Sequence, residues 1–310
     1  MSAPPPFVTV VIAARPGQAE VKAVDASRRL DYPKDRLEII VARGTQPSVQ
    51  RNTAIRAAKG ELIYFLDDDS VPPPDNLRHA VPHFAAPEVV MLGGPNLCPP
   101  DAPPLEQAFA QTMGNSLAFG PSRARYTPVG RLRESSEKEL ILCNLMARRS
   151  ALLDAGGFDE ALYPNEENAL MDDLLRRGGK LLYDPEFVVH RRPRHSLKAF
   201  AKMLMTYGRG RAEQFRLHPT PGSALNFAPP LFCLYLLALP VVPRWCLWPL
   251  AVYALIVLAA ARFRLFTVAP MILLTHLCYG VGFWRGLFTP LRKGTSKTPV
   301  PVALEHIPVA

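Results

Sequence analysis

The sequence predicts a doubly wound α/β domain followed by an apolar C-terminal region. Short apolar runs alternate with polar helical stretches up to about Ser223, and one buried run, residues 61–66, ends in three consecutive aspartates. From Asn226 to Pro290, Leu, Ala, Val, Phe and Trp dominate, although the mean hydropathy of the whole chain is only +0.04. The expected division is an α/β domain at 1–222, a hydrophobic region of two or three helices at 223–290, and a basic tail at 291–310.

The first part of the chain alternates strands with helices. Right-handed crossovers would bring the ends of all these strands to one side of the sheet, where open α/β sheets bind ligands. The expected strands are residues 7–14, 37–41, 61–66 and 88–92, and the expected helices are 18–30, 49–58 and about 75–84.

The following part has a weaker pattern. Residues 95–136 are rich in Pro, Gly, Ser and Arg, which predicts a long irregular loop, either a mobile lid or a disordered segment. Regular elements resume after this loop. The expected strands are 139–147, 180–183 and 187–190, and the expected helices are 151–155, 166–177 and 196–217.

Asp67, Asp68 and Asp69 follow the buried strand directly. Adjacent like charges repel one another unless a cation is bound, and a hard divalent cation takes carboxylate oxygens. Because side chains alternate along an extended chain, Asp67 and Asp69 point the same way, so that the pair can bind one ion. The alternative is a solvated acidic turn that caps the next helix, but the position at a buried strand end favours the ion site.

Four segments in order resemble the family 2 glycosyltransferases. They are RNTAIRAAKGELIYFLDDDS, CNLMARRSALLDAGGFDE, EENALMDDLLRRGG and YDPEFVVH, within a resemblance that covers about residues 7–214. The resemblance implies the nucleotide-sugar-binding fold called GT-A, a doubly wound mixed sheet, followed by C-terminal transmembrane helices. The apolar tail and the YGRGRA segment make the chain similar to bacterial transferases of the succinoglycan and exopolysaccharide type.

The resemblance also implies roles for particular residues. Asp67 and Asp69 would hold Mg²⁺ or Mn²⁺, with His190 near the metal, and Glu167 would be the general base supported by Glu166. The residues implied around the donor are Ile12, Ala13, Arg51, Asn52, Asp68, Arg209 and Arg211, and those implied on the acceptor side are Asn144 and Asp159. The alternatives are a surface arginine for Arg51, an ordinary histidine for His190, and acids that only stabilise a helix N-terminus for the glutamates.

The sequence departs from the family pattern at three places. Glu167 replaces the usual aspartate, so its carboxylate lies one methylene further out. The second strand lacks the usual aspartates that read the nucleotide base, which leaves Gln46, Ser48 or backbone groups for that purpose. The tryptophan expected near Arg209 and Arg211 is absent, which favours addition of single sugars over processive polymerisation.

The charge distribution indicates a membrane partner. The net charge is +9, yet no nucleic-acid-binding motif is present. Between His190 and Leu217 there are eight Lys or Arg against one carboxylate, Glu213, immediately before the apolar segments, which fits an anionic membrane surface. The candidate membrane segments are 231–239, 246–261 and 265–283. Three crossings would place Arg292, Lys293 and Lys297 outside, against the positive-inside tendency, whereas two crossings with an interfacial first segment would place them inside.

The leading hypothesis is therefore a metal-dependent inverting glycosyltransferase at the bacterial inner membrane, with its catalytic domain in the cytoplasm, acting on a nucleotide-sugar donor and a lipid-linked or polysaccharide acceptor. Five isolated cysteines suggest neither a metal site nor a disulfide framework. A non-catalytic relative that binds nucleotide or lipid as a scaffold is the first rival. A nucleotidyltransferase is the second, but it would need a longer glycine-rich loop than residues 13–17.

Overall fold

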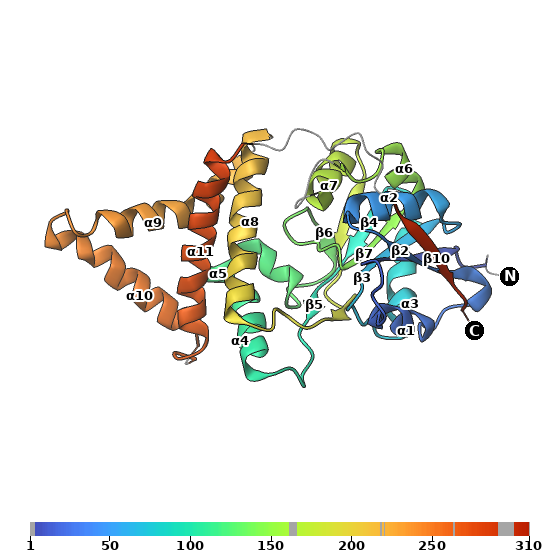
Figure 1. The fold of residues 1–310 in the computed structure, drawn as a ribbon, viewed down its shortest axis with the longest axis horizontal. Helices are drawn as coiled ribbons and strands as arrows, with labels where there is room; N and C mark the ends of the chain where they lie inside the picture. The colour runs from blue at the N-terminus through green and yellow to red at the C-terminus, as the bar shows by residue number, and fades with distance from the viewer. Residues whose placement is uncertain are drawn as a thin grey trace.

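The computed structural model describes residues 4–160, 166–217, 219, 221–262, 264–290 and 301–309. Its centre is an eight-stranded mixed sheet with the strand order β10-β2-β1-β3-β7-β4-β8-β6 (Figure 1). The strands are β1 Val8–Ala14, β2 Leu37–Arg43, β3 Leu62–Asp67, β4 Val89–Gly93, β6 Arg133–Glu134, β7 Asn144–Arg148, β8 Lys180–Tyr183 and β10 Ala303–Ile307.

The direction of β7 corrects one expectation. Strands β2, β1 and β3 are parallel, but β7 runs antiparallel between β3 and β4. The ends of the strands therefore do not all lie on one side, and the start of β7 lies beside the end of β3, with Asn144 opposite Leu66. The mixed sheet implied by the family resemblance is confirmed.

Two layers of helices cover the sheet, because alternate strand residues face opposite sides. Val8, Val10 and Ile12 pack in one core with α1 (Lys22–Arg28) and α3 (Asn76–Ala80). Val11 and its neighbours pack in a second core with α2, α6 and α7 on the other face (Figure 1). These three helices are Pro47–Ala57, Arg149–Asp154 and Glu166–Arg176.

The segment expected to be an irregular loop is largely ordered, so that expectation was wrong. It contains β5 (Asn96–Leu97), α4 (Pro104–Met113), α5 (Ser116–Phe119) and the 3₁₀ helix η3 (Gly120–Arg125). Phe109 of α4 stacks on Phe200 with ring centroids 4.2 Å apart, which fixes the segment against helix α8. The strands expected at 139–147 and 187–190 are shorter, because pairing begins only at Asn144 and at β9 (Val189–His190).

The C-terminal part consists of four helices on one side of the sheet domain (Figure 1). They are α8 Leu197–Leu217, α9 Ala228–Ala238, α10 Trp248–Ala260 and α11 Val268–Phe288. Among the described residues, α11 alone is long and apolar enough to cross a membrane by length and composition, and α9 and α10 are shorter. The transmembrane helices implied by the resemblance therefore remain an expectation.

β10 was not expected from the sequence, which assigned residues 291–310 to a basic tail. It pairs antiparallel with β2 from Ala303 opposite Arg43 to Ile307 opposite Ile39, so the chain returns to the sheet after α11. Arg292, Lys293 and Lys297 lie outside the described residues.

Helices α8 and α11 approach so closely that only glycine fits at their contacts. A Cβ on Gly282 would lie 2.1 Å from the carbonyl oxygen of Met205, and a Cβ on Gly208 would lie 2.1 Å from that of Tyr279. Backbone cannot yield as a side chain does, so a methyl group at either position must push the helices apart.

We therefore expect Gly282→Ala to destabilise the protein by about 1–3 kcal/mol, the usual cost of overpacking, and to lower Tm by several degrees. Thermal unfolding in mild detergent measures this. The matched control is Gly114→Ala, where the new methyl group would meet the Thr127 side chain at 3.3 Å. Equal Tm values for Gly282→Ala and Gly114→Ala would contradict the tight packing of α8 against α11.

Candidate active site

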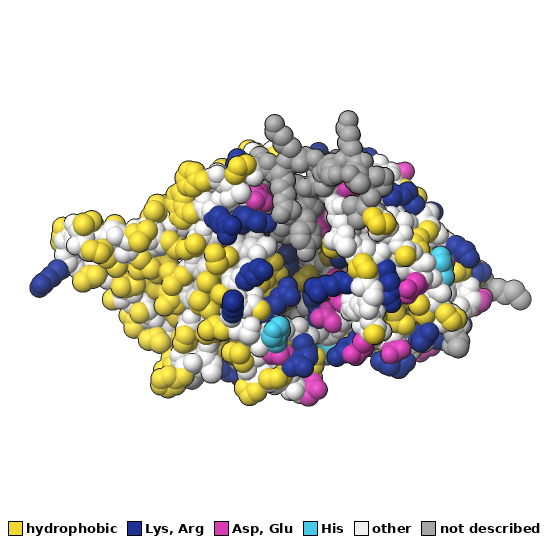
Figure 2. Space-filling model, viewed as in Figure 1, with side chains coloured by type: hydrophobic (Ala, Val, Ile, Leu, Met, Phe, Trp, Pro, Cys, Tyr) yellow, Lys and Arg dark blue, Asp and Glu magenta, His cyan; other side chains and the backbone are white. Residues whose placement is uncertain are grey.

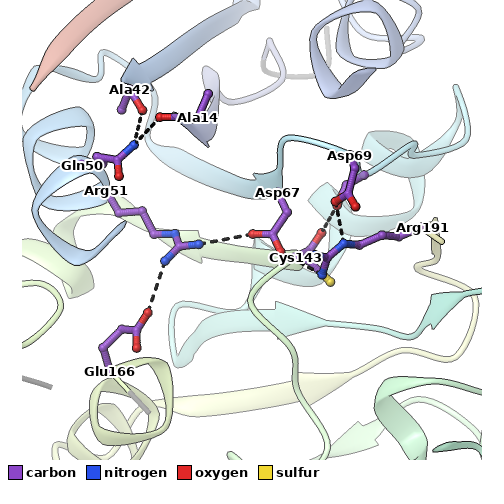
Figure 3. A network of polar contacts seen from close by, with 10 residues as sticks. Ala14, Ala42, Gln50, Arg51, Asp67, Asp69, Cys143, Glu166 and Arg191 are labelled. Atoms are coloured by element: carbon purple, nitrogen blue, oxygen red, sulfur yellow. Dashed lines mark hydrogen bonds and ion pairs between the residues drawn. The ribbon is translucent and has the colours of Figure 1, made fainter. Parts of the chain in front are cut away.

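The acidic end of β3 lies between two arginines (Figure 3). Arg51 of α2 approaches one oxygen of Asp67, with Nη2 to Oδ1 at 3.3 Å. Arg191 approaches the other, with Nη1 to Oδ2 at 2.9 Å, and its Nε donates to Oδ1 of Asp69 at 2.5 Å. Asp67 and Asp69 thus converge on one group as expected, but not by alternation along an extended chain, because β3 ends at Asp67 and the next two residues form a turn.

Arg51 also joins the strand end to the acidic helix α7. Its Nη1 lies 3.3 Å from Oε1 of Glu166, and its guanidinium lies over the Phe158 ring at 6.0 Å from the centroid. Arg51 is 7% exposed, so it is not the ordinary surface arginine of the alternative interpretation. The structure thus brings together Arg51, Asp67 and Glu166, which are far apart in the sequence.

Glu166 is an unusual carboxyl group in this site. Burial raises its pKa from 4.5 to about 7, and the negative charge of Glu167 adds to the shift, whereas Arg51 opposes it. A carboxyl group with such a pKa exchanges its proton near neutral pH. Burial likewise raises the pKa of Asp69, against the effect of Arg191.

Sequence reasoning missed Arg191. The backbones of His190 and Val71 exchange two hydrogen bonds of 2.9 Å, which hold the residues after β9 beside the aspartates. Arg191 also lies beside the buried thiol of Cys143, whose pKa is raised to about 12 chiefly by burial (Figure 3). Only the position of Arg191 directly after the expected strand end could have suggested this role.

The oxygen donors for a cation are present at the end of β3. No group of three or more His, Cys, Asp or Glu side chains suited to a metal occurs in the described part of the chain, so His190 does not complete such a group with the aspartates. Asp67 and Asp69 nevertheless converge on one guanidinium within 2.5–2.9 Å, so a single cation can be reached by both carboxylates. The pair fits a divalent ion that keeps water among its ligands.

The structure places several of the expected donor residues beneath the site. The Ile12 side chain is fully buried in the core, whereas Ala13 lies next to Asp67 in register. Asp68 accepts a 2.5 Å hydrogen bond from Gln18 and takes no part in the contacts with Arg51 and Arg191 that are described above. Ile12 can therefore contact a donor only through its backbone.

Asn52 supports a loop. Its Nδ2 donates to the Phe158 carbonyl at 2.8 Å and to Glu160 at 2.9 Å, and its Oδ1 accepts from the Phe158 N–H at 2.8 Å. Gly157 has φ of +80°, and a Cβ there would lie 2.4 Å from Asn52 Oδ1. The Asn52 amide thus holds the loop before α7, and the structure does not bring it to the donor side.

Base recognition was expected from Gln46, Ser48 or backbone groups. Gln46 Nε2 donates to the Glu160 carbonyl at 2.6 Å, and the Ser48 hydroxyl is buried with no hydrogen-bond partner in the described structure. Gln50 Nε2 joins the ends of β1 and β2 by donating to Ala14 and Ala42 (Figure 3). These contacts stabilise the edge of the sheet where the nucleoside was expected.

Asn144 does not lie on an acceptor-facing surface. It is fully buried, accepts a 2.9 Å hydrogen bond from Tyr64 and donates to the Phe187 carbonyl at 2.6 Å. Its amide therefore fixes the segment before β9. Asp159 is exposed in the loop before α7.

The two arginines of α8 lie at the junction between the sheet domain and the C-terminal helices. Arg209 lies 3.4 Å from Glu213 on its own helix. Arg211 is near Glu137 and Gln214, at 4.0 and 3.0 Å, and its pKa is lowered by burial and by the charge of Arg125. The charge of Glu167 opposes this lowering, so Arg211 of α8 lies within electrostatic range of the start of α7.

A mixed α/β sheet with an aspartate pair at a strand end and acids at the start of a facing helix defines a GT-A-like protein. The model of the family described as "Glycosyltransferase like family 2" matches residues 2–206. The chain belongs to this family of glycosyltransferases.

Two comparisons add detail. The pre-mycofactocin glycosyltransferases of two Mycobacterium tuberculosis strains are 27% identical over 173 residues, which is 56% of this chain but only 36% of their own length. The mannosyltransferase PcManGT from Pyrobaculum calidifontis, solved in complex with GDP-Man and Mn²⁺, aligns with a TM-score of 0.60 at 17% identity over 92% of this chain and 88% of that one. This structural likeness shows the fold.

The raised pKa of Glu166 predicts a pH dependence of stability. Because the folded state holds the proton more tightly than the unfolded state, the stabilisation is complete below pH 4.5 and is lost as the pH rises through about 7. Each pKa unit corresponds to about 1.4 kcal/mol, so the loss is roughly 3 kcal/mol.

We expect Glu166→Gln to lack this loss, so that its Tm falls less than that of the wild type between pH 5 and pH 8. Thermal unfolding at both pH values measures the difference. Glu88→Gln, which changes an exposed glutamate, is the control. If the wild type, Glu166→Gln and Glu88→Gln all show the same change with pH, Glu166 does not titrate near neutrality.

Proposed function

We propose that this protein is a metal-dependent inverting glycosyltransferase. It transfers a sugar from a nucleotide-sugar donor to a lipid-linked or polysaccharide acceptor in cell-envelope or exopolysaccharide synthesis, at the cytoplasmic face of the bacterial inner membrane. The observation that carries the proposal is the bridge by Arg51 between Asp67 and Glu166, because it couples the strand end suited to a donor to the helix that bears the base.

The donor's diphosphate is assigned to the end of β3. Asp67 and Asp69 would hold Mg²⁺ or Mn²⁺, in keeping with the Mn²⁺ in the PcManGT complex. When bound, the ion neutralises charge that develops on the leaving diphosphate. Arg51 and Arg191 already lie at these aspartates, and their N–H groups are suited to binding phosphate oxygens.

Glu167 is assigned as the general base. Inverting transfer needs a carboxylate opposite the leaving group to take the proton of the attacking hydroxyl. Glu166 is engaged with Arg51, whereas the charge of Glu167 acts on Arg211 of α8. Glu167 thus lies on the side of the C-terminal helices, from which a lipid-linked acceptor would approach, and Glu166 positions Arg51.

The C-terminal helices support a membrane-bound acceptor. The 15 Leu, Ile, Val and Phe residues between Leu231 and Leu258 favour insertion by about 5–9 kcal/mol at 0.3–0.6 kcal/mol each, and Arg244 opposes it by about 2.5–3.5 kcal/mol. The apolar contribution is the larger one. Figure 2 shows hydrophobic side chains covering this part of the molecule.

One observation favours a second candidate, a non-catalytic relative that binds nucleotide or lipid as a scaffold. Arg191 already neutralises the aspartates that would hold the metal. A panel of UDP-, GDP- and dTDP-sugars with Mg²⁺ or Mn²⁺ and membrane lipid extract separates the two, because only the enzyme releases nucleoside diphosphate.

Glu167→Gln should lower kcat by roughly 10²–10⁴-fold while donor affinity stays near that of the wild type, because glutamine keeps the side-chain volume but accepts no proton. Turnover with the donor found in the panel, and calorimetry for donor affinity, measure the two effects. Glu167→Asp restores the family's usual acid and should retain substantial activity. Turnover of Glu167→Gln at the wild-type rate would exclude Glu167 as the base.

Arg191→Gln should bind Mn²⁺ more tightly than the wild type, by roughly tenfold, because a positive charge at the shared site repels the ion and competes for the carboxylates. Calorimetric titration with Mn²⁺ alone measures this without turnover. The matched control is Arg192→Gln, since Arg192 is paired with Glu106 at 2.7 Å instead. Weaker or unchanged Mn²⁺ affinity in Arg191→Gln would show that Arg191 does not occupy the position of the cation.

A further inference from the structure

Helices α9 and α10 form an apolar hairpin that projects from the rest of the molecule. They leave α11 on the side opposite the sheet and meet at a tip around residues 239–247 (Figure 1). From Ala224 to Ala261 the sequence contains one charged residue, Arg244. Large apolar side chains are exposed along both helices, including Leu237 at 76% and Leu255 at 67%, and Trp245 at the tip at 71%. This hairpin lacks a protein partner on its outer surface within the described chain.

α11 is the longest apolar helix, but its neighbours make it unsuited to crossing a bilayer. It lies side by side with α8 along the glycine contacts at Gly208 and Gly282 (Figure 1). α8 carries several charged side chains, which are Lys198, Lys202, Arg209, Arg211, Glu213 and Arg216. If α11 crossed the hydrocarbon layer, α8 would be drawn into it with these charges, which a bilayer interior disfavours strongly.

α11 is also covered on its other side. The sulfur of Cys233 in α9 would lie 2.5 Å from a Cβ on Gly280, and Trp284 donates to the Pro230 carbonyl at 3.0 Å. Val257 of α10 packs with Ile272 of α11 in one apolar cluster. α11 is thus the central helix of the C-terminal part, with α8 on one side and the hairpin on the other.

The path of the chain limits the number of crossings. α8 follows directly from the sheet, and β10 returns to the sheet at β2, where Glu305 pairs with Arg43 at 2.6 Å. Both ends of the apolar region are therefore on the same side of any membrane, which excludes one or three crossings. The 11 residues of α9 and the 13 of α10 extend about 16 and 20 Å, against about 30 Å of hydrocarbon.

We propose that the protein is monotopic: the α9–α10 hairpin inserts into the cytoplasmic leaflet, α8 and α11 lie along the membrane surface, and α11 does not cross. This rests on the membrane attachment in the proposed function. The partner is an anionic bilayer, because α8, which runs along α11 on the side opposite the hairpin, exposes Lys198, Lys202 and Arg216 for contact with headgroups. Trp245 at the tip and Trp248, the first residue of α10 next to it, enter the leaflet with the hairpin.

The three tryptophans of the chain report directly on this arrangement, since two lie at the tip and Trp284 lies on α11. The full chain is bound to phosphatidylglycerol/phosphatidylethanolamine vesicles that contain lipids brominated in the middle of the acyl chains, which quench nearby indoles. Trp284→Phe leaves the tip tryptophans, and the double change Trp245→Phe/Trp248→Phe leaves Trp284. We expect at least threefold stronger quenching of the tip tryptophans than of Trp284. Equal or stronger quenching of Trp284 would place α11 in the bilayer and overturn the proposal.

Vesicle flotation tests the hairpin itself. Leu237→Arg should reduce the bound fraction at least fivefold, whereas Leu153→Arg, at a leucine 40% exposed on α6, should bind as the wild type does. Unaltered vesicle binding of Leu237→Arg overturns the proposal. So does a wild-type protein that forms a dimer without lipid and does not bind vesicles, if Leu237→Arg dissociates that dimer. Sugar transfer by the wild type is assayed separately. Turnover without vesicle binding refutes the membrane attachment and leaves the proposed transferase activity standing. Vesicle binding without turnover refutes the transferase activity alone.

Discussion

The structure depends on the neutralisation of carboxylates that lie close together at the edge of the sheet. Asp67 and Asp69 at the end of β3 and Glu166 at the start of α7 would repel one another, and their burial raises this cost. Arg51 and Arg191 neutralise these carboxylates by ion pairs. The same ion pairs connect α2, β3, α7 and the segment after β9 at one place.

Much of the sheet domain could be predicted from the sequence, because alternating apolar residues determine buried strands and the aspartates mark the end of one. α4 was missed, because the richness of residues 95–136 in Pro, Gly, Ser and Arg favoured a loop. Pro104 is in fact the first residue of this helix, a position that suits proline, and Phe109 packs against Phe200. The roles of Asn52 and Asn144 could not be predicted. A buried amide contacts whichever backbone groups the tertiary structure brings to it, and no local pattern encodes that choice.

The role of Arg191 could not be predicted from the sequence either. Arg191 is one of several arginines in its segment of the sequence. Its role arises because His190 of β9 pairs with Val71, 119 residues earlier. Long-range pairing also determines which acid faces which partner on α7. Glu166 forms an ion pair with Arg51, while the charge of Glu167 acts on both Glu166 and Arg211 of α8, so the start of α7 is electrostatically linked to the site and to α8. A displacement of Arg211 with α8 would therefore change the electrostatic environment of Glu167.

The return of the chain at β10 has a consequence for biosynthesis. β2 is an edge strand until β10 pairs with it. The contact between Arg43 of β2 and Glu305 of β10 joins residues that are 262 positions apart in the sequence. During translation the sheet therefore presents an open edge, which is prone to intermolecular pairing, until all the apolar helices have been made. Closure of so long a loop is slow, so that, if the hairpin inserts into a lipid surface as proposed, its insertion and the completion of the sheet become coupled steps.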